Sequence, residues 1–139
     1  MIFLIIEMKL IAKKKLSNKV KNKLPDLFKH SGTLIYNLEH YFECWEGKDL
    51  IGAIQLEYDK PVLVKFKPQF SLFIYNFEIV PGKRNKGYGK TIIENLLPEL
   101  PIYEVELMYW NEDSRRFWSK LGFRVINKET KLMKKKIKK

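Results

Sequence analysis

A run of basic residues and glycines between Pro81 and Gly89 is the segment of this sequence best suited to chemistry. Lysine and arginine supply positive charge there, and Gly87 and Gly89 allow the backbone to approach a ligand closely. An apolar run, Leu72 to Val80, precedes the turn, and apolar residues at helical spacing follow it. A strand, a turn and a helix in this order place free N–H groups and a partial positive charge at the start of the helix. Phosphate groups bind at such helix ends, so this segment predicts a phosphorylated ligand.

The spacing of the glycines excludes two common phosphate-binding motifs. Gly89-Lys90-Thr91 supplies the end of a P-loop, but Arg84 stands where the first glycine of that motif belongs. A dinucleotide-binding fingerprint needs a third glycine at the position that Ile92 occupies. The alternative that remains open is a basic turn between a strand and a helix that binds no ligand.

Sequence patterns on both sides of the turn predict alternating strands and helices. Strands are predicted at Ile2 to Ala12, Leu38 to Trp45, Leu50 to Tyr58, Val62 to Phe66, Leu72 to Val80, Tyr103 to Trp110, Phe123 to Ile126 and Lys131 to Ile137. Helices are predicted at Lys13 to His30 with Ser17 as a cap and a kink at Pro25, from Gly87 to Pro98, and at Asn111 to Lys120 with Gly122 as the C-cap.

The order of these segments also predicts how the strands pair. Glu46 to Asp49 is expected to close a hairpin between the second and third strands, and turns are expected at Asp59 to Pro61 and Lys67 to Gln69. The two C-terminal strands are expected to be antiparallel. The strands before and after the helix that starts at Gly87 form a βαβ unit, so this pair is expected to be parallel.

The composition fits one folded domain spanning residues 1–139, with 45% hydrophobic and 14% aromatic residues. The apolar run Ile2 to Ile6 is too short to span a bilayer and no cleavage pattern follows it, so a cytoplasmic protein without a membrane partner is predicted. Cys44 is the only cysteine, which excludes an internal disulfide and a cysteine metal cluster, and no metal is expected. The net charge of +11 leaves nucleic acid open as a partner of the lysine-rich tail, Lys131 to Lys139, although dispersed lysines favour a solvated surface.

Two motifs resemble those of the GNAT N-acetyltransferase superfamily. Arg84 to Gly89 resembles its R-x-x-G-x-G pyrophosphate-binding turn. About 30 residues later, Asn111, Ser114, Phe117, Lys120, Gly122 and Phe123 match its N-x-x-[AS]-x-x-[FL]-Y-x-K-x-G-F signature. The resemblance covers roughly residues 38–137. It implies an α/β fold of the α+β kind, in which helices flank a mixed, mostly antiparallel central sheet with one splayed parallel strand pair.

The resemblance also implies that acetyl-CoA is the cofactor. Backbone N–H groups from Arg84 to Lys90 would hold its pyrophosphate, with countercharge from Lys83 and its basic neighbours, and one N–H near Ile79 or Val80 would polarise the thioester carbonyl. The splay would lie between Ile79-Val80 and Met108-Tyr109. The residues expected to bind the cofactor are Ile79, Val80, Arg84, Asn85, Lys86, Gly87, Tyr88, Gly89, Lys90, Thr91, Asn111, Phe117, Trp118 and Lys120.

The activity implied by the resemblance is transfer of the acetyl group to a primary amine that attacks the thioester directly. A base must first remove the amine's proton, and Glu78 is the candidate, with Glu57 as the alternative. In the family a tyrosine commonly protonates the departing thiolate, but Trp118 occupies that position here, and an indole N–H is not a useful acid. Tyr109 is the candidate substitute, together with Tyr88.

Two other functions remain open at the level of sequence. One is a relative that binds acyl-CoA without turnover, which the missing tyrosine suggests. The other is a basic protein associated with nucleic acid. The acceptor is expected to be an amine on a small molecule or a peptide, and no signature in the sequence identifies it. A homodimer is also left open.

Overall fold

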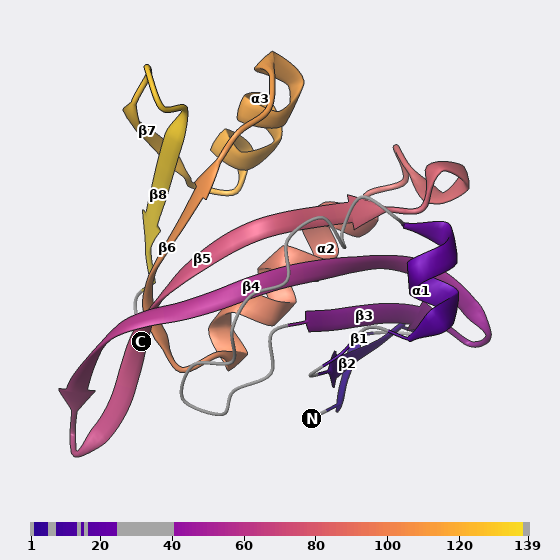
Figure 1. Cartoon of the computed structure of the whole chain (residues 1–139), viewed down its shortest axis with the longest axis horizontal. Coiled ribbons are helices and arrows are strands. Elements are labelled where there is room, and N and C mark those ends of the chain that lie inside the picture. Colours follow the sequence, from indigo (N-terminus) through magenta and orange to yellow (C-terminus); the bar gives the residue numbers. More distant parts are fainter. Residues whose placement is uncertain (1, 6–7, 14, 16, 25–40, 138–139) are drawn as a thin grey trace.

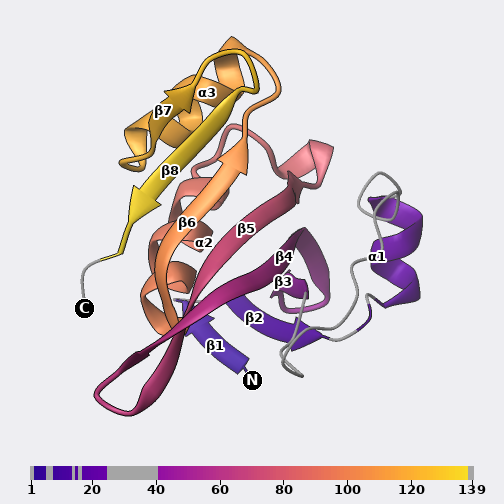
Figure 2. The same ribbon diagram turned by 60° about the vertical axis from the view of Figure 1, so that its left-hand side comes forward.

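An eight-stranded mixed sheet is the centre of the computed structural model, which describes residues 2–5, 8–13, 15, 17–24 and 41–137 (Figures 1 and 2). The strands are β1 Ile2–Ile5, β2 Met8–Lys13, β3 Tyr41–Glu46, β4 Asp49–Val64, β5 Lys67–Ile79, β6 Ile102–Met108, β7 Arg124–Asn127 and β8 Leu132–Lys136. Their spatial order is β1-β2-β3-β4-β5-β6-β8-β7. Among the described strands, β5 and β6 pair in parallel and all other neighbours are antiparallel. The predicted fold class and the predicted parallel pair are confirmed.

Helices cover both faces of the sheet. In the described part of the chain they are α1 Asn18–Lys23, α2 Tyr88–Leu96 and α3 Glu112–Lys120, with short 3-10 turns at Pro81–Lys83 and Leu97–Glu99. Ile92 and Ile93 of α2 belong to the main core, which includes Ile54 of β4, whereas Val20 of α1 packs with Ala53 in a smaller second cluster. Because consecutive strand residues point to opposite faces, α1 and α2 lie on opposite sides of the sheet (Figure 2). None of the described helices is long and apolar enough to cross a membrane.

The N-terminal segment differs from the prediction. Ile2 to Ala12 was expected to form one strand, but β1 and β2 form an antiparallel pair in which Phe3 lies opposite Leu10. Glycine, proline and asparagine are the usual marks of a tight turn, and residues 2–12 contain none of them. The periodicity of apolar residues therefore could not separate two short strands from one long strand.

The predicted helix from Lys13 to His30 is described only in part. Lys13 ends β2, α1 covers Asn18–Lys23, and Pro25 to His40 lie outside the described residues. Ser17 occupies the N-cap position as expected, but its side chain makes no capping hydrogen bond. Its backbone N–H instead donates to the carboxylate of Glu43 at 2.7 Å, and Glu43 is only 1% exposed. This contact joins the start of α1 to β3.

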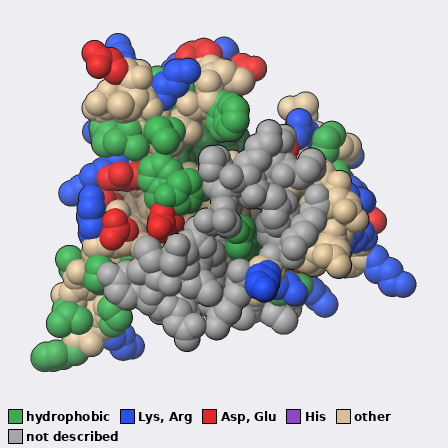
Figure 3. Space-filling model, viewed as in Figure 1, with side chains coloured by type: hydrophobic (Ala, Val, Ile, Leu, Met, Phe, Trp, Pro, Cys, Tyr) green, Lys and Arg blue, Asp and Glu red, His purple; other side chains and the backbone are tan. Residues whose placement is uncertain are grey.

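The β4–β5 hairpin is longer than the sequence patterns predict. The turns expected at Asp59 to Pro61 and Lys67 to Gln69 are wrong, because the first is an irregularity within β4 and the second begins β5. The chain reverses at Lys65 and Phe66 instead. The end of this hairpin projects beyond the rest of the molecule at the lower left of Figures 1 and 3. The β3–β4 hairpin through Glu46 to Asp49 is confirmed.

The lysine-rich C-terminal segment is largely part of the sheet. β8 lies between β6 and β7, which confirms the predicted terminal antiparallel pair. Lys134 Nζ lies 3.3 Å from a carboxylate oxygen of Glu104 and 3.2 Å from one of Glu106. Lys135 Nζ donates to the carbonyl oxygen of Leu121. These lysines therefore serve the fold and do not form a free basic tail.

Candidate functional site

A cavity of about 490 Å³ lies where the C-terminal end of β5, the start of α2 and one side of α3 meet. Its volume falls within the range of small-molecule and cofactor sites, about 300–1,000 Å³. The lining residues are Phe77, Glu78, Ile79, Lys83, Arg84, Asn85, Gly87, Tyr88, Gly89, Lys90, Ser114, Phe117, Trp118, Lys120 and Leu121. Most residues expected from the sequence to bind the cofactor are thus brought to one cavity.

β5 is unpaired on one side where it meets this cavity. Its parallel pairing with β6 ends at Ile74 opposite Leu107, whereas its antiparallel pairing with β4 continues to Ile79 opposite Gly52. In Figure 1 the two strands accordingly diverge: β6 runs toward α3, and β5 runs away from it toward the turn that precedes α2. The expected splay is therefore present, and it begins before the end of β5.

The backbone of Ile79 faces the open side of this splay. The N–H of Val80 donates to the carbonyl oxygen of Ile51 at 2.8 Å. Hydrogen-bonded and non-hydrogen-bonded pairs alternate along an antiparallel ladder, so the N–H and C=O of Ile79 turn away from β4. The sequence led us to expect that Ile79 or Val80 offers an N–H to the cofactor. The N–H of Val80 is bonded within the sheet, whereas the N–H of Ile79 points into the opening.

The start of α2 supplies the donors of an anion site. Gly87 is the N-cap with φ +82, a left-handed conformation that glycine adopts without strain. The first hydrogen bond of the helix runs from the N–H of Thr91 to the carbonyl oxygen of Gly87. The N–H groups of Tyr88, Gly89 and Lys90 precede it and so lie outside the helical ladder. Within α2, all of which is described, the first turn carries no acidic residue.

Arg84 ties the turn before α2 to the end of β5. Its Nε donates to the carbonyl oxygen of Ile79 at 2.8 Å, and its Nη2 lies 3.6 Å from the carboxylate of Glu78. The Arg84 side chain is about half exposed. Both contacts orient the guanidinium over the end of the strand, beside the cavity.

Aromatic rings from β5 and α3 form an apolar part of the cavity wall. The ring of Trp118 packs edge-on against Phe117, with centroids 5.0 Å apart, and lies 6.0 Å from Phe77 and 5.2 Å from Phe123. Trp118 is only 7% exposed and belongs to the main core. It therefore supports the cavity wall as a packed hydrophobic residue.

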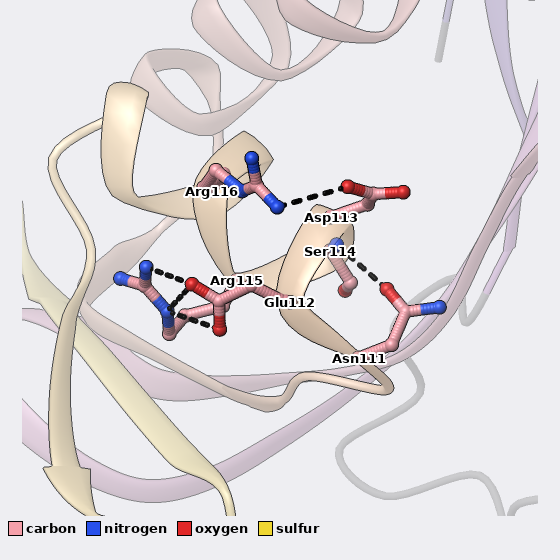
Figure 4. Close-up of polar contacts among 6 residues, drawn as sticks. All are labelled: Asn111, Glu112, Asp113, Ser114, Arg115 and Arg116. Carbon is pink, nitrogen blue, oxygen red and sulfur yellow. Dashed lines mark hydrogen bonds and ion pairs between the residues drawn. The ribbon is translucent and has the colours of Figure 1, made fainter.

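Asn111 caps α3, in agreement with the predicted start of that helix. Its Oδ1 accepts a hydrogen bond from the N–H of Ser114 at 2.9 Å (Figure 4). Figure 4 also shows ion pairs along the first turn of the helix, between Arg115 and Glu112 and between Arg116 and Asp113. Asn111 is not a lining residue of the cavity, so its expected contact with the cofactor has no geometric support.

Several other expected residues also lie away from the cavity wall. Val80, Lys86, Thr91 and Tyr109 are not among its lining residues. Tyr109 follows β6 and donates its backbone N–H to the carbonyl oxygen of Lys131. Glu57, the alternative base, is also outside the lining and accepts a hydrogen bond from the hydroxyl of Tyr75.

Tyr88 lines the cavity, but its hydroxyl donates to Glu46 at 3.2 Å. Partial burial, followed by the negative charge of Glu46 and this hydrogen bond, raises the pKa of Tyr88. A phenol held in this way is a weaker proton donor than a free one. Within the described part of the chain, no group of three or more His, Cys, Asp or Glu side chains is arranged to hold a metal.

Three lining residues were not expected from the sequence: Phe77, Ser114 and Leu121. Spacing could have identified all three. Phe77 precedes Ile79 by two residues on β5, and such residues share one face of a strand. Ser114 and Leu121 lie three or four residues from Phe117 and Trp118, which places them on the same side of α3.

A mixed sheet with a splayed parallel pair, whose opening faces a basic helix start, defines an acetyltransferase fold. The model of the Acetyltransferase (GNAT) family matches residues 8–123. This chain therefore belongs to the GNAT acetyltransferase family. Among curated proteins, no sequence match is found.

Solved structures show the same fold at low sequence identity. PH1933 from Pyrococcus horikoshii OT3 aligns with a TM-score of 0.65 at 21% identity, over 96% of this chain and 100% of that chain. The Bacillus subtilis N-acetyltransferase YlbP in complex with coenzyme A gives 0.61 at 17% identity, over 94% and 97%. Arabidopsis thaliana Naa50 with the bisubstrate analogue CoA-Ac-MVNAL gives 0.59 at 16% identity, over 95% and 100%. By contrast, this chain spans 66% of the AtaT toxin, less than two thirds of its length.

Proposed function

We propose that this chain, as a single domain, binds acetyl-CoA and transfers its acetyl group to an amine. One observation carries the proposal: the free N–H groups at the start of α2 and the outward-facing backbone of Ile79 reach the same cavity. Family membership supports it. The coenzyme A bound to YlbP and the CoA-containing analogue bound to Naa50 support it as well.

The pyrophosphate of the cofactor would lie on the first turn of α2. Its negative charge would meet the N–H groups of Gly89 and Lys90, the positive end of the helix dipole, and the side chains of Lys83 and Arg84. The pantetheine arm would then run along the open edge of β5, where the N–H of Ile79 faces it, while the carbonyl oxygen of Ile79 accepts from Arg84. An N–H in that position can also stabilise the oxyanion that forms when the thioester is attacked.

Glu78 is the proposed base for the attacking amine. It lines the cavity even though its neighbours Phe77 and Ile79 point to the other face of β5. All three residues reach the cavity because it lies at the unpaired edge of the strand. Glu57 lies outside the lining and is the weaker candidate.

The leaving group would depart as a thiolate without a dedicated acid. Trp118 offers no acidic proton, Tyr109 is outside the cavity lining, and Tyr88 donates its hydroxyl to Glu46. A thiol of pKa about 8.5 leaves as a thiolate near neutral pH at a cost of about 2 kcal/mol. This cost slows turnover but does not prevent it.

The proposed acceptor is an amine, on either a small molecule or a peptide. Among the structural relatives, Naa50 holds an analogue that contains the peptide MVNAL, whereas AtaT is complexed with acetyl-methionyl-tRNA. The same fold thus accompanies very different acceptors. A small molecule and a peptide both remain compatible with the cavity of this chain.

Thermal unfolding with coenzyme A and with acetyl-CoA tests the proposed site. Saturation at about a hundred times the dissociation constant is expected to stabilise the wild type by roughly 2.7 kcal/mol. A Lys90→Glu variant is expected to lose this response, because its carboxylate would repel the pyrophosphate. The substitution replaces the exposed pair of Lys90 and Glu94, 3.8 Å apart, by two like charges at a cost of about 0.5 kcal/mol. A glutamate in the first turn of a helix is otherwise favourable and offsets this cost, so the variant should fold.

A Lys128→Glu variant is the matched control for Lys90→Glu. Lys128 is exposed in the turn between β7 and β8 and lies outside the cavity lining. The Lys128→Glu variant carries the same change of charge away from the site, so it should be stabilised by coenzyme A as much as the wild type. If the wild type is not stabilised, or if both variants respond equally, the cofactor site is wrong.

A second candidate function is acyl-CoA binding without turnover. The burial of Trp118, where the family commonly carries a tyrosine acid, is the observation that favours it. Release of free coenzyme A that depends on an added amine separates the two functions. Release with any member of an amine panel supports the transferase, and tight acetyl-CoA binding without release across the panel supports the binding protein.

A further inference from the structure

The end of the β4–β5 hairpin extends beyond the sheet as a separate arm. β3 pairs with β4 only as far as Tyr41 opposite Gln55, and β6 pairs with β5 only from Phe70 onward. Between these limits, Val62 to Val64 pair only with Lys67 to Gln69 of the same hairpin among the described residues. We name residues 60–69 the hairpin arm. It projects at the lower left of Figures 1 and 3.

Large apolar side chains are exposed along this arm. Leu63 is 74% exposed and Phe66 is 98% exposed, while Val62 and Val64 are each nearly half exposed. Hydrophobic side chains accordingly gather at this end of the molecule in Figure 3. These side chains contribute little to the core of their own protein, so folding does not account for them.

The apolar groups point to both faces of the arm. The side chains of Val62 and Val64 lie on one face. Leu63 and Pro68, which are opposite each other in the hairpin, lie on the other face. Phe66 lies at the apex between the two strands. A flat protein surface would cover only one face of such an arm, whereas a lipid phase surrounds an inserted tip on every side.

The turn at the apex also places Phe66 where folding alone disfavours it. Lys65 has φ +51 and Phe66 has φ +66, which is the backbone of a turn that normally carries asparagine and glycine. A side chain with a Cβ is strained in this region, and a bulky one more so. The strain is compensated neither by burial nor by a core contact of the exposed ring.

Positive charge accompanies the exposed apolar groups. Lys60, Lys65 and Lys67 are exposed on the arm, and Asp59 next to it is the nearest acidic residue in the sequence. Pro61 and Pro68 lack an N–H, which lowers the number of donors that would lose water on insertion. Apolar residues with flanking lysines are the combination that binds the surface of membranes containing anionic lipids.

We propose that the hairpin arm inserts its tip into the headgroup region of a bilayer that contains anionic lipids. Val62 to Val64 extend about 7 Å along the strand, within the depth of about 5–10 Å at which interfacial segments bury their apolar residues. Leu63 and Phe66 enter the acyl boundary, and Lys60, Lys65 and Lys67 contact the phosphates. This peripheral contact departs from the sequence-based expectation of no membrane partner, and it needs no membrane-spanning helix.

The arm and the candidate cofactor cavity lie at opposite ends of β5. Twelve residue steps separate Lys67 from Ile79, which corresponds to about 40 Å of extended strand. A molecule attached to a membrane by the arm would therefore keep the cavity away from the lipid surface. The inference does not depend on the proposed catalytic function.

Vesicle co-sedimentation tests the inference directly. The full chain is mixed with phosphatidylcholine vesicles, with and without phosphatidylglycerol. The wild type is expected to sediment with the vesicles that contain phosphatidylglycerol and to dissociate from them as salt rises. A Leu63→Ser/Phe66→Ser variant is expected to bind these vesicles at least about tenfold more weakly, because the inserted apolar area is lost.

A Trp110→Ser/Ile126→Ser variant is the matched control. These two side chains are 79% and 52% exposed and lie outside the arm, so their loss should leave vesicle binding unchanged. Thermal unfolding of both variants checks that each one folds. The inference is overturned if the wild type does not bind anionic vesicles, or if the arm variant binds them as well as the wild type.

A second copy of the chain is the competing occupant of the arm. Sedimentation equilibrium of the wild type and the arm variant without vesicles separates the two cases. A monomer in both samples, together with vesicle binding by the wild type alone, supports insertion into lipid. A wild-type dimer that the arm substitutions dissociate, without vesicle binding, would show that the arm binds another copy.

Discussion

A Cβ atom placed on Gly89 would lie 3.1 Å from Cζ of Phe117 and 3.2 Å from its Cε1. The start of α2 and the side of α3 therefore meet closely, and a Cβ at this glycine would fit only with a small shift of the Phe117 ring. Both residues line the candidate cofactor cavity. Gly89 has a packing role in addition to the close approach to a ligand that the sequence motif suggests, and a large substitution there would disturb the fold and the site together.

Substitution of Gly89 by valine is expected to destabilise the protein by about 1–3 kcal/mol, the usual cost of overpacking. Substitution by alanine should cost much less, because replacing glycine within a helix recovers about 0.5–1 kcal/mol. Urea unfolding measures both effects. Removing the ring in a Phe117→Ala background should relieve part of the valine penalty, giving a coupling energy of roughly 0.5–3 kcal/mol. Strictly additive effects would mean that the two residues do not clash.

Removal of the Asn111 side chain tests whether this residue acts as a helix cap. Asn111→Ala is expected to lower the free energy of unfolding by about 1 kcal/mol, whereas Asn111→Ser should retain most of the stability because serine also caps helices well. The dissociation constant of coenzyme A should be unchanged in both variants, because Asn111 lies outside the cavity lining. A large rise in the dissociation constant of coenzyme A for the stable Asn111→Ser variant would instead support the contact between Asn111 and the cofactor that the sequence motif implies.

The local parts of the site were predictable because the information lies in short segments. Gly87 and the basic residues before it mark the turn, and Asn111 and Gly122 mark both ends of α3. The structure confirms the end of that helix: Gly122 has φ +93, and the N–H of Phe123 bonds to the carbonyl oxygen of Trp118. Turn and cap chemistry depends on residues close in sequence, so one sequence is enough to read it.

The parts that were missed depend on contacts between distant residues. The projection of the hairpin arm could not be predicted, because it depends on where β3 and β6 stop pairing with β4 and β5. The same holds for Val80, whose N–H is taken by Ile51 across the sheet. Strand register selects which backbone groups face a cavity, and no local pattern records it.

The pair Tyr75 and Glu57 makes stability depend on alkaline pH. The hydrogen bond to Glu57, with smaller effects of burial and of the charges of Glu57 and Asp59, raises the pKa of Tyr75 to about 12. An unfolded tyrosine titrates near pH 10. The contribution of this pair is therefore complete below about pH 10 and is lost as the pH rises toward about 12.

Titration of tyrosinate absorbance measures this effect. A Tyr75→Phe variant identifies the late-titrating phenol by difference from the wild type. In a Glu57→Gln variant, the pKa of Tyr75 should fall toward about 10, because the charged acceptor is gone. A pKa of Tyr75 that stays near its wild-type value in Glu57→Gln would assign the shift to burial and the charge of Asp59 and would contradict the role of Glu57.

Glu78 can act as the base for the acceptor amine or as the partner that holds Arg84 in place. Substitution by glutamine separates these two roles. As the base for the amine, its loss in Glu78→Gln should lower kcat/KM about 10²-fold or more near neutral pH. The residual rate should rise with pH, because more of the amine is already unprotonated. If the main role of Glu78 were instead to hold Arg84, whose Nη2 lies 3.6 Å from its carboxylate, the substitution would weaken coenzyme A binding. We expect the first role, in which the dissociation constant of coenzyme A changes little in Glu78→Gln. Coenzyme A release with the first amine found active in the panel, followed across pH, measures the first effect, and the thermal shift measures the second. An equal loss of rate at every pH together with weakened cofactor binding would make Glu78 a positioning residue and leave the base to be found elsewhere.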